Sequence, residues 1–241
     1  MKNAIVLTAL ALSCTAPALA APLKEVPARL DPTKAYILVE IANFNDTNAA
    51  GTLVLARYDR DGGDVRGGTR SKAPPLAKGV AVRESIVSKP LVKAKNSRLY
   101  LLEVEPDAWV IEGSAGTAYS LGSYSFDAPA GKIVDLGVLA PRTDWREGDS
   151  QGKANRQLLT SALLGGFGKK MEPTPTMIAA RSRQSSDLAV PAALAKIGVQ
   201  PVSFVAGAKF GNYLGGLVNR IDGRQARPGA SANDTAGKAA D

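Results

Sequence analysis

The chain has 241 residues, of which 30 are Lys or Arg and 22 are Asp or Glu, so its formal net charge at pH 7 is +8. It contains no histidine and a single cysteine, Cys14. These counts exclude a Ser-His-Asp or Cys-His catalytic site and a zinc site of the usual Cys/His kind. Hydrophobic residues make up 45% of the chain, which is enough to build the core of a globular protein.

The first twenty residues have the pattern of a secretory signal peptide. Lys2 supplies a positive charge, residues 4–12 form an uncharged and mostly apolar run, and an Ala-Leu-Ala sequence ends at Ala20. The run is shorter than the roughly 20 residues that cross a bilayer, and no later apolar run predicts a transmembrane span. We expect residues 1–20 to be removed and the protein to be exported to the periplasm or cell envelope. The alternative is a lipoprotein acylated at Cys14, although the residues before it fit that signal poorly.

Seven short β-rich segments follow a lead-in over residues 21–33, and turns rich in Gly, Pro, Asn and Asp separate them. We predict strands at 34–44, 52–58, 80–87, 98–104, 109–112, 119–126 and 132–139. With no helical pattern between them, they predict a mainly-β fold, an antiparallel β-sandwich over residues 34–141. We expect its core to include Tyr36 or Ile37, Leu53, Leu101, Trp109, Phe126 and Ile133.

The pattern changes after Pro141. Residues 142–224 contain short, interrupted apolar runs, so we expect a mixed helical and extended C-terminal appendage that packs on the sandwich. Its predicted elements are helices at 156–164, 177–184, 190–196 (capped by Asp187) and 209–223, and an extended run at 199–205. Residues 225–241 are expected to be a disordered tail.

Two groups of acidic residues invite a functional interpretation. Asp59, Asp61 and Asp64 surround a Gly-Gly turn, as in calcium loops, but an EF-hand counted from Asp59 would need Glu where Arg70 stands. A hairpin turn is the preferred interpretation, and no metal or cofactor is predicted.

The second group is the set of acids that a glycosidase-like carboxylate pair would need. Glu103 and Glu105 would share a face of one strand, because side chains alternate along a strand. Asp107 and Glu112 are the other two acids of the group. A solvent-facing strand carries such residues routinely, so no catalytic residue is assigned.

Between Arg66 and Arg98 the chain has nine basic residues and one acid, Glu84. Such a stretch is attracted to polyanions, which in the envelope are anionic lipid, lipopolysaccharide or acidic glycans. No aromatic residue interrupts the stretch to stack on bases, so no nucleic acid is predicted. The alternative is a solvated basic surface, and a protein partner is left open. The candidate anion-binding residues are Arg66, Arg70, Lys72 and Lys78.

A resemblance rests on the segments Leu99–Val104, Trp109–Ile111, Tyr124–Phe126, Pro129–Lys132 and Val134–Gly137. Together with residues 199–220, this pattern resembles a group of uncharacterised exported bacterial proteins with a transthyretin-like or carboxypeptidase-regulatory-like β-sandwich. The resemblance implies that fold and an exported location, and it supplies no site.

These observations predict a non-enzymatic binding or structural module of the cell envelope. The rival hypothesis is a carboxylate-dependent hydrolase that acts on an envelope polymer. Without His or Cys, such a hydrolase would depend on carboxylates, Lys, Ser, Thr or Tyr.

Overall fold

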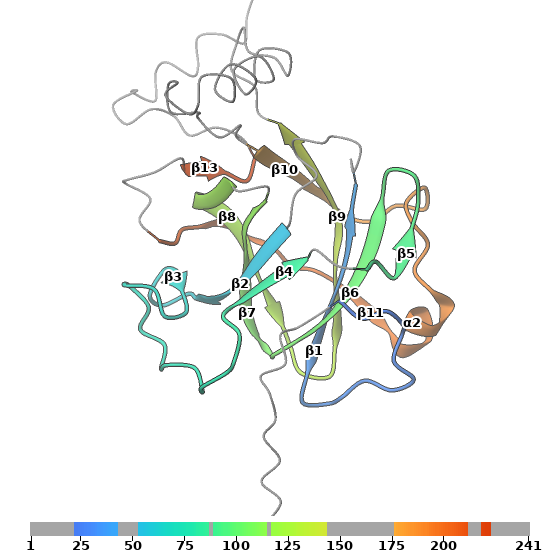
Figure 1. Cartoon of the computed structure of the whole chain (residues 1–241), viewed down its shortest axis with the longest axis horizontal. Coiled ribbons are helices and arrows are strands. Elements are labelled where there is room, and N and C mark those ends of the chain that lie inside the picture. Colours follow the sequence, from blue (N-terminus) through green and yellow to red (C-terminus); the bar gives the residue numbers. More distant parts are fainter. Residues whose placement is uncertain are drawn as a thin grey trace, which may run out of the picture.

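The computed structural model describes residues 22–42, 53–86, 89–114, 117–143, 176–211 and 218–222. In this part of the chain two β-sheets form a β-sandwich-like, mainly-β fold, which confirms the predicted fold class (Figure 1). The described residues include one helix, α2 (Ala192–Ile197). None of their helices has the length and apolar character that a membrane span requires. The predicted signal peptide, the predicted helix at 156–164 and the C-terminal tail lie outside the described residues.

The first sheet, sheet A, is mixed rather than purely antiparallel. Its strand β1 (Ala35–Ile41) pairs antiparallel with one neighbour, β6 (Arg98–Val104), and parallel with the other, β9 (Ile133–Thr143). The outer edge of β9 is divided between two further strands. The other members of sheet A are β5 (Val92–Lys93), β10 (Thr176–Arg181) and β11 (Val199–Pro201).

The second sheet, sheet B, is built around the long hairpin of β7 (Asp107–Ser114) and β8 (Thr117–Ala128). The two sheets are also joined directly, because the backbone N–H of Ile178 in β10 donates to the carbonyl oxygen of Ile221 at 2.8 Å. The remaining strands of sheet B are β2 (Leu53–Asp59), β3 (Asp64–Val65), β4 (Arg83–Ile86), β12 (Val205–Ala208) and β13 (Val218–Arg220).

Sheet A is buried on both faces. Its inner face contributes Ile37 to the core between the sheets, whereas Tyr36 belongs to a second, outer cluster. That outer cluster is covered by Leu194 of α2 and by partly buried residues of the lead-in. Double burial explains why all seven residues of β1 are buried and why the strand reads as a nearly continuous apolar run.

All the predicted core residues are buried, but they belong to two different clusters. Leu53, Trp109 and Phe126 lie between the sheets. Leu101 and Ile133 lie in the outer cluster with Tyr36. The sequence left Tyr36 and Ile37 as alternatives, and both are buried because each faces one of the two packed surfaces.

The C-terminal segment supplies strands where helices were predicted. Residues 176–181 form β10, which pairs antiparallel with β9, so the predicted helix at 177–184 is wrong. Residues 218–220 form β13, which pairs parallel with β8, in place of part of the predicted helix at 209–223. In both cases an available strand edge supplied backbone partners that local propensity does not register. The predicted helix near 190–196 is present as α2, but its N-cap residue is Pro191 rather than Asp187.

A β-bulge marks the point where the outer edge of β9 changes partner. Residue Leu38 of β1 pairs with Asp135, and two residues later Glu40 pairs with Val138, so β9 carries one extra residue. That bulge contains Gly137, whose φ is 73°. A Cβ atom on Gly137 would overlap the carbonyl oxygen of Arg181, at the end of β10. Only glycine meets both requirements without strain.

We therefore expect Gly137→Ala to lower the free energy of unfolding by about 2–3 kcal/mol, measured by urea denaturation. The matched control is Gly67→Ala, because Gly67 also has a positive φ of 77° but open space around its Cβ position. This control should cost only about 1 kcal/mol, the penalty of left-handed backbone alone. Equal losses in the two variants would show that the approach of Arg181 does not matter.

Candidate anion-binding surface

The basic segment after β2 is organised by a carboxylate. We call residues 60–82 the β3 loop; it leaves β2 at Asp59, whose side chain accepts five hydrogen bonds. One oxygen accepts the backbone N–H groups of residues 61 and 62, both at 3.1 Å. The other accepts the hydroxyl of Ser71 at 3.0 Å and the N–H groups of Lys72 and Ala73. These donors, the N–H of Gly62 first among them, hold the pKa of Asp59 well below its usual value.

A second carboxylate, that of the fully buried Asp64, ties the β3 loop to the C-terminal segment. It accepts the backbone N–H groups of Val65 at 2.9 Å, Arg70 at 3.2 Å and Gly211 at 2.7 Å. Residues 58–59 pair antiparallel with residues 64–65, which confirms the hairpin interpretation. The oxygens of Asp59 and Asp64 face N–H and O–H donors, and the described residues contain no cluster suited to a metal ion.

Two of the four candidate anion-binding residues are already engaged. Arg66 donates to Asp107 at 3.1 Å, and Asp107 also accepts a 2.6 Å bond from the buried Arg57. Arg70 donates to the carbonyl oxygens of residues 63 and 211 at 3.2 Å and lies beside Asp64. The other two, Lys72 and Lys78, are exposed and form no ion pair with any described residue.

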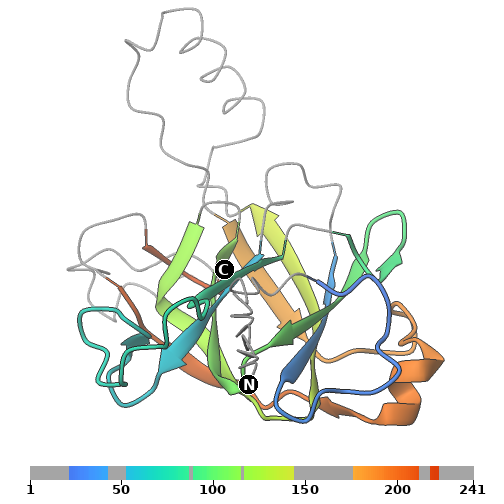
Figure 2. The ribbon, with the colours of Figure 1, turned by 60° about the horizontal axis from the view of Figure 1, so that its bottom comes forward.

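The fold separates the two ends of the basic stretch that is continuous in the sequence. The hairpin containing β3 lies at one side of the sandwich, and β5 lies at the opposite side (Figures 1 and 2). This separation follows from the topology, because β3 is at one end of sheet B and β5 is at one end of sheet A. The nine basic residues therefore do not form one patch.

The β5 end carries lysines that form no ion pair with the described acids. We call residues 89–98 the β5 hairpin; it contains no acid. It is held to β6 by the N–H of Leu91, which donates to the Leu99 carbonyl at 2.7 Å, and is closed by a 3.0 Å bond from the Ala94 N–H to the Ser97 carbonyl. Three exposed lysines project from it, and none pairs with a described acid: Lys89, Lys93 and Lys95.

The carboxylates considered for hydrolysis are each held by a partner. Glu103 accepts the hydroxyl of Tyr36 at 2.9 Å, and Glu105 forms an ion pair with Lys34. Glu112 accepts two bonds, at 2.7 and 2.8 Å, from the Nε of one guanidinium, that of Arg83. Asp107, as described above, is shared by two arginines. These contacts explain three of the acids as members of ion pairs and Glu103 as the acceptor of a tyrosine hydroxyl.

The sequence located the basic stretch, but it did not show that the fold places the two ends of the stretch on opposite sides of the molecule. It also could not predict which arginines pair with carboxylates, since Asp107 is far from Arg57 and Arg66 in the chain. Comparisons of the chain with protein-family models, with curated proteins and with solved structures found no match. The resemblance to transthyretin-like sandwiches accordingly stays a prediction.

We expect Asp59→Asn to release the segment around residues 71–73, because the new amide N–H₂ group would face one O–H and two N–H donors. Backbone amide exchange of Lys72 and Ala73 should accelerate by about tenfold or more. The matched control is Asp61→Asn, which changes the same chemistry at an exposed side chain of the same loop and should leave those exchange rates unchanged.

The same variant has a pH signature. Because the folded-state pKa of Asp59 is lowered, its stabilising contribution is present above the unfolded value of about 3.9 and is lost as the pH falls through the folded value. The difference in urea midpoint between the parent and Asp59→Asn should therefore shrink between about pH 5 and pH 2. A difference that stays constant over this range would contradict the proposed role of the ionised carboxylate.

Proposed function

We propose that this protein is an exported, non-enzymatic binding module of the cell envelope that holds an anionic partner on its β5 hairpin. The observation that carries the proposal is the group of three exposed lysines on that hairpin, with no acid among residues 89–98 and no ion pair to the described residues. Elsewhere in the basic stretch, Arg66, Arg70 and Arg83 each lie within ion-pair distance of an acid, and two exposed lysines, Lys72 and Lys78, form no ion pair with the described residues.

The kind of cation favours a particular kind of partner. Lysine ammonium groups are hydrated point charges on flexible stems, which suit a diffuse anionic surface better than one shaped ligand. Each such lysine near an anionic lipid surface contributes about 1 kcal/mol of attraction, which salt screens over roughly 8 Å at physiological ionic strength. The partner class is therefore an envelope polyanion: anionic lipid, lipopolysaccharide or an acidic glycan.

The position of the hairpin supports a binding role. The chain after β4 returns to sheet A through residues 89–98, and Leu91 and Val92 pack against the outer cluster. A loop anchored in this way keeps the lysines on a rigid scaffold while leaving their ammonium groups in water. Lysines on sheet edges also prevent edge-to-edge pairing, which is the function that remains if the hairpin binds nothing.

The contacts of the lead-in are compatible with export. Pro22 and Leu23 lie two and three residues after Ala20, and both are held on sheet A: Pro22 bridges to Leu102, and the N–H of Leu23 donates to Leu101 at 2.7 Å. Cleavage after Ala20 would leave these contacts intact. The hydrolase alternative receives no comparable support, because its acids are held by Lys34, Arg83 and the partners of Asp107.

The test compares two double variants that remove the same charge from opposite sides of the molecule. Lys93→Ser with Lys95→Ser alters the β5 hairpin, and Lys72→Ser with Lys78→Ser alters the β3 loop. Binding is measured at low salt to vesicles containing anionic lipid, to lipopolysaccharide and to an acidic glycan. Loss of about 2 kcal/mol predicts roughly thirtyfold weaker binding for the β5 variant, with little change for the β3 variant.

The three probes identify which polyanion is bound, and raising the salt concentration should weaken binding of the parent protein. If the β3 variant lost affinity instead, the site would be the loop that carries Arg66, Arg70, Lys72 and Lys78. Unchanged binding of both variants would overturn an electrostatic site in the basic stretch. The remaining role of the lysines would then be to prevent edge-to-edge pairing of strands.

A further inference from the structure

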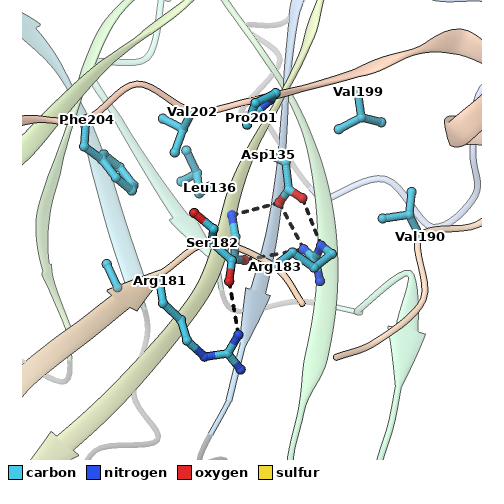
Figure 3. A pocket seen from close by; sticks show the side chains of 12 residues that line it. Asp135, Leu136, Arg181, Ser182, Arg183, Val190, Val199, Pro201, Val202 and Phe204 are labelled. Carbon is cyan, nitrogen blue, oxygen red and sulfur yellow. Dashed lines mark hydrogen bonds and ion pairs between the residues drawn. The ribbon is translucent and has the colours of Figure 1, made fainter. Parts of the chain in front are cut away.

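A cavity of about 430 Å³ opens at the outer edge of β9, in the gap between β10 and β11. Strand β11 covers residues 133–135 of β9, and β10 covers residues 138–143, so the bulge at Gly137 lies in the gap between them. Figure 3 shows Asp135 and Arg183 face to face in the middle of the lining, with Phe204 on one side and Val190 and Val199 on the other. We call this cavity the β9 pocket. Its volume is in the range of small-molecule sites.

The guanidinium of Arg183, one of two arginines that line the pocket, has no donor left for a ligand. Arg183 donates from Nε and Nη2 to Asp135 at 2.9 and 3.0 Å, and from Nη1 to Glu40 at 2.7 Å. Its two remaining N–H groups reach the carbonyl oxygens of Leu188 and Gly137, both at 3.4 Å. A guanidinium has five N–H groups, and here all five meet protein acceptors. The Arg183 guanidinium therefore offers no free donor to an anionic ligand, and the other arginine of the lining, Arg181, is paired with Asp187.

The charges around the pocket are unequal in number. Arg183 is matched against two carboxylates, those of Glu40 and Asp135, whose side chains are 3% and 12% exposed. The neighbouring Arg181 pairs with Asp187 through two 2.6 Å bonds, which leaves that pair neutral. Among the described residues at this site, one negative charge is thus uncompensated in a partly buried setting.

One carboxylate oxygen keeps acceptor capacity. Oδ1 of Asp135 accepts the N–H of Gly137 at 2.8 Å and one N–H of Arg183. Oδ2 accepts a single bond, from Nε of Arg183. Each carboxylate oxygen has two lone pairs, so Oδ2 has room for another donor.

Apart from Arg181 and Ser182, the side chains of the remaining wall are apolar. Phe204 packs against Tyr124 with ring centroids 5.3 Å apart and meets Phe126 edge-on at 5.9 Å. These two contacts fix the ring that lines the pocket. The other apolar side chains of the lining are Leu136, Ala180, Val190, Val199, Pro201 and Val202.

We propose that the β9 pocket binds a small organic ammonium ion, its carbon chain against the apolar wall and its ammonium group toward the carboxylate of Asp135. The apolar wall buries the chain, and the uncompensated negative charge selects the cation. The saturated guanidinium offers nothing to a carboxylate or phosphate. This site is separate from the β5 hairpin and does not depend on the function proposed for it.

The experiment titrates the whole chain with three six-carbon probes that differ only in their head group: hexylammonium, hexanol and hexanoate. Calorimetry or NMR shift changes at low salt measure the affinities. We expect hexylammonium to bind at least about tenfold more tightly than hexanoate, with hexanol between them. Nα-acetyl-lysine methylamide is a fourth probe, which distinguishes a lysine side chain from a free amine as the source of the ammonium group.

Two tryptophan variants locate the site. Ser182 is exposed and lines the pocket, so Ser182→Trp should block it without disturbing the core. Ser186→Trp is the control, because Ser186 is exposed but outside the lining. The expected result is loss of hexylammonium binding in the first variant and retention in the second. Tighter binding of hexanoate, equal binding of all three head groups, no binding of any probe, or equal behaviour of the two tryptophan variants would each overturn the proposal.

Discussion

The hydrogen bonds of Arg183 hold together parts of the chain that no local element would join. Its guanidinium reaches β1 through Glu40, β9 through Asp135 and Gly137, and the segment before α2 through the carbonyl of Leu188. Both carboxylates are largely buried, so each needs this cation as a partner. This arrangement holds the segment between the end of β10 and the start of β11 against sheet A.

That contact gives the C-terminal segment its structural importance. Strands β10 and β11 complete sheet A, and β12 and β13 extend sheet B. The helix α2 adds Leu194 to the outer cluster, where it meets Tyr36 and Ile133. A sheet with both faces covered has few places left for a ligand on its surface. The pocket accordingly lies at an edge, where the bulge of β9 interrupts regular pairing.

Carboxylates serve as anchors around the β3 loop. Asp59 and Asp64 gather backbone N–H groups of the β3 loop, and Asp107 gathers Arg57 and Arg66. In the basic stretch, Arg66 pairs with Asp107, Arg70 lies beside Asp64 and Arg83 pairs with Glu112. The exposed lysines of the stretch form no ion pair with the described residues, and three of them lie on the β5 hairpin. The distribution of unpaired charge on the described surface thus depends on the positions of the acids in the fold as well as on the positions of the basic residues in the sequence.

The sequence by itself determined the β-rich class and the approximate positions of β1, β2, β4 and β6 to β9, because alternation and turn residues act over a few neighbours. The strand predicted at 98–104 coincides with β6. The short strands β3 and β5 carried no periodic signal, and β10 and β13 were predicted as helices. Only the tertiary structure decided that β10 pairs with β9 and β13 with β8, and that Tyr36 and Ile37 are both buried. It also decided that Arg66 and Arg70 contact described acids, whereas the β5 lysines do not. Each of these outcomes depends on partners distant in the chain, whose approach is a property of the packed sheets and not of local residue order.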